Sequence, residues 1–193
     1  MATTEIITAF RQGGTKNGIS IATIKAAIEI FGLGKIFHLE QTPEDSYAIS
    51  MQDGFELTVS ETEIKQAAMG SRFIKLENQE IFEYANLCFA AMAKRAQLEK
   101  ADDFGPFTYD QAMQALNNGE YYLEGVNWLG LRHHCRSIGR KYVFHYPGVI
   151  GASKQHCFFS SFGIEDAYGS PYPIVGLEER FCKWWRISPE QLY

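Results

Sequence analysis

Residues 12–18 have the sequence QGGTKNG, and they lead directly into the apolar run ISIATIKAAIEIF at residues 19–31. Because this run is apolar on nearly every side, it predicts a buried helix rather than a surface helix. Asn17 or Gly18 is the expected N-cap, and Gly32 is the expected stop. We expect the rest of the chain to be organised around this helix and the glycine-rich loop that enters it.

The start of a buried helix is a favourable place for a nucleophilic thiol. Its backbone N–H groups and its dipole favour the thiolate over the thiol. A Gln side chain shortly before the helix can help to hold the oxyanion that develops during acyl transfer. Gln12 precedes Gly18 in this way, so the loop and helix indicate a site of the thiol-peptidase type.

Gln12, Gly13 and Ala22 resemble the signature Gln-Gly-x-x-x-x-Cys-x-x-x-Ala of papain-like cysteine peptidases, especially of their calpain-like branch. The resemblance implies a papain-like fold, an oxyanion-holding role for Gln12 and a nucleophile at position 18. In this chain that position is Gly18, which has no side chain to attack a substrate. Loss of a nucleophile costs on the order of a million-fold in rate in a related triad. We therefore expect a chain that is inactive as a peptidase.

The resemblance also implies a histidine base and an orienting residue from late in the chain. His156 matches best, because residues 154–159, KQHCFF, resemble the family's Gly-His-Ala-Tyr/Phe strand. Asp166 opens the segment DAYG at 166–169, which is similar in outline to the Asn-Pro-Trp-Gly turn that orients the histidine in calpain-like enzymes. Two structural alternatives stay open: a half-buried strand histidine and a solvated loop acid.

The other histidines are weaker candidates. His145 is expected on a neighbouring strand with a structural role, and His133 and His134 are expected as a pair on a helix surface. Two other residues are candidate substitutes for the thiol. Ser20 should point away from residue 18, because adjacent helical positions do not share a face. Cys157 should face away from His156 and pack in the core, because successive strand residues alternate.

The rest of the chain has helical patterns first and strand patterns later. The patterns predict a hairpin of residues 47–51 and 55–59 around Asp53-Gly54, capping boxes at 60–63 and 108–111, helices over 80–100, 125–139 and 177–185, and strands over 34–40, 141–146, 155–160 and 172–175. This order is typical of an α+β fold. We predict one papain-like domain over 1–193, with a helical lobe over about 1–139 and a sheet lobe over about 140–193.

Composition limits the functional classes. The net charge of −5, without Lys/Arg runs, argues against nucleic-acid binding. A signal-like segment and a long apolar stretch are both missing, so no membrane association is expected. Four cysteines without Cys-x-x-Cys spacing predict free thiols in a reducing, cytoplasmic compartment, with export by a non-classical route left open. No residues have metal-ligand spacing, so neither a metal nor another cofactor is expected.

Three functions remain in competition. The first is a papain-like scaffold without its nucleophile, natural or engineered, which binds a peptide or protein segment in its cleft. The second is a binding or adaptor module without catalytic ancestry. The third is an active toxin-type hydrolase or acyltransferase that uses another nucleophile. The first function predicts a site made of Gly18, Gln12, His156 and Asp166, and the oligomeric state is left open.

Overall fold

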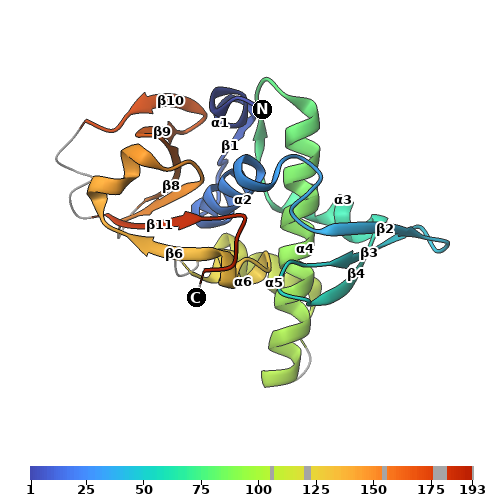
Figure 1. Cartoon of the computed structure of the whole chain (residues 1–193). Coiled ribbons are helices and arrows are strands. Elements are labelled where there is room, and N and C mark those ends of the chain that lie inside the picture. The colour runs from blue at the N-terminus through green and yellow to red at the C-terminus, as the bar shows by residue number, and fades with distance from the viewer. Residues whose placement is uncertain (105–106, 120–122, 154–155, 176–181, 193) are drawn as a thin grey trace.

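Helix α2, Gly18–Phe31, lies at the centre of the computed structural model, between a helical part and a sheet (Figure 1). The structure describes residues 1–104, 107–119, 123–153, 156–175 and 182–192. The other helices are α1 (Thr3–Ala9), α3 (Glu61–Gly70), α4 (Gln79–Phe104), α5 (Tyr109–Asn117), α6 (Glu124–Trp128) and the short 3₁₀ helices η1 (Arg132–His134) and η2 (Arg140–His145). The strands are β1 (Phe10–Arg11), β2 (His38–Thr42), β3 (Ser46–Ser50), β4 (Glu56–Ser60), β5 (Ile74–Lys75), β6 (Cys135–Ile138), β7 (Val149–Ala152), β8 (Cys157–Ser161), β9 (Ile164–Ala167), β10 (Ser170–Pro173) and β11 (Lys183–Ile187).

The expectation of a buried helix after the glycine-rich loop is confirmed. Every side chain from Ile19 to Ile28 is buried, because α2 packs against β7 and β8 on one side and against α1, α4 and α6 on others. Asn17 is its N-cap. The helix ends at Gly32, whose φ of 91° suits a residue without a Cβ and whose N–H donates to the carbonyl of Ile28 at 2.9 Å.

Both predicted capping boxes are present. Ser60 and Thr108 accept hydrogen bonds from the backbone N–H groups three residues later, at 3.2 Å in each case. The side chains of Glu63 and Gln111 accept from the N-cap backbone in return, at 2.9 and 2.8 Å. These reciprocal bonds start α3 and α5, and α5 ends at Asn118 as expected.

The predicted hairpin is confirmed as β3 and β4, with Ile49 opposite Leu57. Strand β2 pairs with β3, on the side away from β4. The first strand was expected over 34–40, but it begins only at His38. The hairpin is fixed to α4 by Arg95, which contacts the Asp53 carboxylate at 2.7 Å and lies over the Phe55 ring. This small sheet therefore belongs to the helical part of the molecule.

The larger sheet has the strand order β10-β9-β8-β7-β11-β6, and each neighbouring pair of these strands is antiparallel. Alternate residues face opposite sides of it. Ile150 and Phe159 join the main core under α2, whereas Val149 and Phe158 join a second, smaller core with Val143 and Trp184. The mixed helix and sheet content agrees with an α+β fold.

Two predicted elements near the start of the sheet are wrong. The helix expected over 125–139 ends at Trp128, because Gly130 takes a φ of 75° and ends the helical path. Residues 135–138 form the edge strand β6 instead, within the region assigned to the helical lobe. The strand expected over 141–146 is the 3₁₀ helix η2, in which only Val143 is buried, so the alternating aromatic residues do not mark a strand.

The end of the chain also differs from the expectation. A helix was expected over 177–185, but residues 183–185 belong to β11, which pairs with β6 and β7 on its two sides. The first part of that prediction, 177–181, lies outside the described residues. The last predicted strand, 172–175, is found slightly earlier as β10, and β9 was not predicted at all.

Within the described residues, no helix combines the length and apolar character that crossing a bilayer requires.

The centre of the large sheet provides a test of the packing. Gly151 lies opposite both Phe158 and Trp184, whose rings meet edge to face at 5.5 Å. A Cβ on Gly151 would lie 2.5 Å from the first ring and 2.7 Å from the second. Gly151→Ala should therefore lower the free energy of unfolding by about 1–3 kcal/mol, measured by urea denaturation. Gly14→Ala is the matched control, because a Cβ there meets nothing within 4 Å. Equal midpoints for the two variants would contradict this packing.

Candidate functional site

The loop before α2 is fixed by its own polar groups. The Gln12 side-chain amide donates to the carbonyl of Thr15, which closes the loop on itself. The N–H of Lys16 donates to the carbonyl of Asn117 at 2.8 Å. A Cβ at Gly13 would overlap the carbonyl of Arg72, so only glycine allows the loop to lie this close to the chain after α3.

Asn17 ties the start of α2 to two other elements. Its buried side-chain amide donates to the carbonyl of Ser71 at 2.7 Å and to the side-chain oxygen of Asn117 at 2.8 Å. Its side chain makes no capping bond to its own helix. The N–H groups of the first turn of α2 are therefore left for another acceptor, as an anion-stabilising site requires.

All four predicted site residues line one cavity at the start of α2. A cavity of about 20 Å³ is lined by Gln12, Gly18 and His156, and also by Asp166. A cavity of this size holds roughly one water molecule. The structure therefore places these predicted residues around one point, while their catalytic roles stay predictions.

Gly18 is the residue on which the chemistry depends. Its φ is not in the left-handed region, so its backbone accepts any L-residue. A Cβ built on it would lie 3.4 Å from Oε1 of Gln12, 3.2 Å from the carbonyl oxygen of Cys157 and 3.7 Å from the Cβ of Cys157. A small side chain thus fits with shifts of a few tenths of an ångström, and it would enter the cavity next to Gln12.

His156 lies just before β8, between two aromatic rings. Its ring stacks on Phe158 at 5.3 Å between centroids and contacts Tyr168 at the same separation. Burial lowers the pKa of His156, and the nearby Asp166 carboxylate opposes part of that effect. The imidazole is therefore neutral at neutral pH, the form in which it can accept a proton.

Asp166 is buried in strand β9, so the alternative of a solvated loop acid is wrong. One carboxylate oxygen accepts from the Lys25 ammonium at 2.6 Å, and the other accepts from the N–H of Gly169 at 2.6 Å. The described residues show no hydrogen bond between Asp166 and the ring of His156. Asp166 thus binds Lys25 directly, and its charge affects the pKa of His156.

Lys25 is the residue that the sequence analysis missed. Its ammonium is fully buried and donates to the carbonyls of Ile7 and Phe10, at 2.9 and 2.6 Å, as well as to Asp166. Burial lowers the pKa of Lys25, whereas the Asp166 charge raises it. The signal available in the sequence was a single lysine inside an otherwise apolar helix, since a buried charge needs a partner.

The substitutes and the other histidines have defined places. Ser20 is buried and does not line the cavity. Cys157 was expected in the core, and it does pack there, but it also lines the cavity, and burial raises its pKa to about 11. His134 is not on a helix surface: it is buried and packs edge-on against Phe31. His145 ends η2 rather than lying in a strand.

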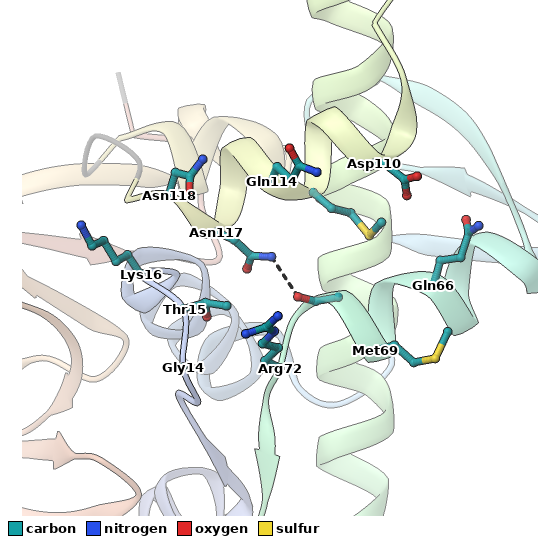
Figure 2. Close-up of a pocket in the computed structure, with 12 residues that line it drawn as sticks. Gly14, Thr15, Lys16, Gln66, Met69, Arg72, Asp110, Gln114, Asn117 and Asn118 are labelled. Carbon is teal, nitrogen blue, oxygen red and sulfur yellow. Dashed lines mark hydrogen bonds between the residues drawn. The ribbon is translucent and has the colours of Figure 1, made fainter.

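A second hollow lies on the other side of the same loop. This groove has a volume of about 670 Å³ and is bounded by residues 14–16, the end of α3 and one face of α5 (Figure 2). The α5 side chains that line it are Asp110, Met113, Gln114 and Asn117, spaced three and four residues apart as on one helix face. Sequence patterns gave no indication of this groove, because it is formed by three separate segments.

Among the described residues, no group of three or more His, Cys, Asp or Glu side chains is placed to hold a metal ion. Comparisons of the chain with models of protein families, with curated proteins and with solved structures found no match. The chemistry of the cavity and of the groove is therefore the basis for a functional proposal.

The buried ion pair gives the first prediction of this site. Lys25→Met leaves the Asp166 carboxylate buried without its cation, and should lower the free energy of unfolding by about 3–5 kcal/mol. The double variant Lys25→Met, Asp166→Asn removes the stranded charge and should recover part of that loss. Urea denaturation of both single variants and the double variant measures the coupling. Strictly additive losses would mean that the pair does not act as a unit.

The burial of His156 gives a pH dependence. Its pKa in the folded chain is below 6.5, so between that lowered pKa and 6.5 the unfolded chain binds more protons than the folded chain. Stability should therefore fall as the pH falls through this window. His156→Gln cannot take up the proton, and its stability should decline less steeply from about pH 7 to about pH 5. An unchanged slope in urea denaturation would contradict a buried, neutral imidazole.

Proposed function

We propose that this chain is a papain-like peptidase scaffold of the calpain type that lacks its nucleophile at Gly18, and that it binds a peptide or protein segment without cleaving it. The observation that carries the proposal is the meeting of Gln12, Gly18 and His156 at the start of a buried helix. These segments are far apart in the sequence, and a catalytic site of this class needs all three together.

The chemistry of the arrangement supports binding rather than cleavage. Gly18 offers the helix N-terminus but no atom that can form a covalent bond with a carbonyl carbon. His156 is neutral and can accept a proton, yet no acidic hydroxyl or thiol at residue 18 supplies one. The cavity holds roughly one water molecule, whereas the groove beside it has the size of a ligand site.

One observation favours an active enzyme as a second candidate. Cys157 lines the same cavity, with its Cβ 3.7 Å from the place where a Cβ on residue 18 would lie. Burial opposes this role, because a pKa of about 11 leaves the thiol almost fully protonated at neutral pH. Selective labelling of Cys157 by iodoacetamide at pH 7 would favour the second candidate over the first.

Restoring the thiol tests the proposal. In a Cys157→Ala background, Gly18→Cys should give a thiol with a pKa below the usual value of about 8.5, because it lies at a helix N-terminus beside an imidazole. We expect alkylation by iodoacetamide at pH 7 at least about tenfold faster than that of the half-buried Cys135, whose pKa desolvation raises to about 12. Peptide mapping by mass spectrometry assigns each label to its cysteine.

The background substitution has a structural reason. A Cβ–Cβ separation of 3.7 Å is that of a disulfide, so in Gly18→Cys alone dissolved oxygen could oxidise the new thiol and Cys157 to a disulfide. Gly18→Ala in the same background is the control for added volume, and adding His156→Gln should slow the alkylation. A folded Gly18→Cys variant that reacts as slowly as Cys135, with or without His156, would refute the site.

A further inference from the structure

We infer that the groove beside the Gln12–Gly18 loop is the peptide site, and that it selects a segment carrying a carboxylate. This inference rests on the proposed peptide-binding function and names the chemistry of its ligand. The groove, of about 670 Å³, lies within the size range of small-ligand sites. Its floor and walls come from the loop, the end of α3 and the face of α5, as Figure 2 shows.

Positively charged side chains outnumber acids in the lining of the groove. Lys16 and Arg72 both line the groove, and within the described residues neither forms an ion pair. Asp110 is the one acid among the lining residues, and it lies at the end away from Lys16 (Figure 2). The groove thus has two cations without an ion-pair partner among the described residues and only one acid, although the whole chain has a net charge of −5. Its local positive charge should attract an anion.

Arg72 also has an unusual backbone conformation. Its φ is 51°, in the left-handed region that favours glycine, although arginine has no local side-chain bond that compensates for this conformation. Strain of this kind persists where the surroundings fix it, and here Ser71 and Gly70 are held by Asn17 and Asn117 at 2.7 and 2.9 Å. Glycine would suit this backbone better, but it would remove the Arg72 side chain from the lining of the groove.

The remaining lining groups fit a peptide rather than a free ion. The side-chain amides of Gln66 and Gln114 have no hydrogen-bond partner among the described residues, so they can donate to and accept from a peptide backbone. Met69 is 73% exposed and the buried Met113 also lines the groove, so the two side chains offer an adaptable apolar contact. The expected ligand is an extended segment with a carboxylate next to an apolar residue.

The test is selection from a randomised octapeptide library with amidated C-termini, by the immobilised full chain. We expect Asp and Glu to be enriched at least threefold among the retained peptides relative to the input. Arg72→Gly should lower the retention of acidic peptides by about tenfold, the size of one lost charge-assisted contact. The same variant should unfold at an unchanged or higher urea concentration, because it relieves the left-handed backbone.

Lys35→Gln is the matched control, since it removes one positive charge from an exposed residue outside the groove and should leave retention unchanged. A second library with free C-termini distinguishes a terminal carboxylate from a side-chain carboxylate. Retention of peptides without acidic preference would overturn this inference and leave the proposed function standing, whereas no retention of any peptide would overturn both. Acidic enrichment that survives Arg72→Gly would exclude the groove as its site.

Discussion

The structure depends on how one buried ammonium group is satisfied. Lys25 lies in the middle of the central helix, and its three protons reach two carbonyls of the N-terminal segment and the carboxylate of Asp166 on the sheet. Desolvating a charge is costly, so leaving any of these groups without its partner lowers the free energy of unfolding by several kcal/mol. The pair therefore fixes helix α2 relative to β9, and with it the relation between Gly18 and His156.

Local signals in the sequence were sufficient for the elements that depend on local bonds. Gly32, the Asp53-Gly54 turn and the capping residues Ser60 and Thr108 each act within a few residues, and all of them were predicted correctly. The strands β6 and β11 were missed, because their hydrogen bonds join segments about 50 residues apart, and pairing of that kind overrides local helical periodicity.

The sequence predicted those residues of the site that belong to a recognisable motif. Gln12, Gly18, His156 and Asp166 were all named from the sequence and line one cavity, but Asp166 was expected in a turn and instead binds Lys25. Asp166 binds Lys25 and not His156 because it is buried: a buried carboxylate binds the nearest cation in preference to a neutral imidazole. The groove needed three folded segments and was beyond any sequence pattern.

The side chain of Asn117 links the two hollows mechanically. It lies in the wall of the groove, and it also accepts a bond from Asn17, the residue that begins helix α2. A ligand that orders Asn117 would also restrain the first turn of the helix, and any change at the helix start would be felt in the groove by the same free energy. The hydrogen bond between these two asparagines is therefore a direct physical connection from the wall of the groove to the residue that precedes Gly18.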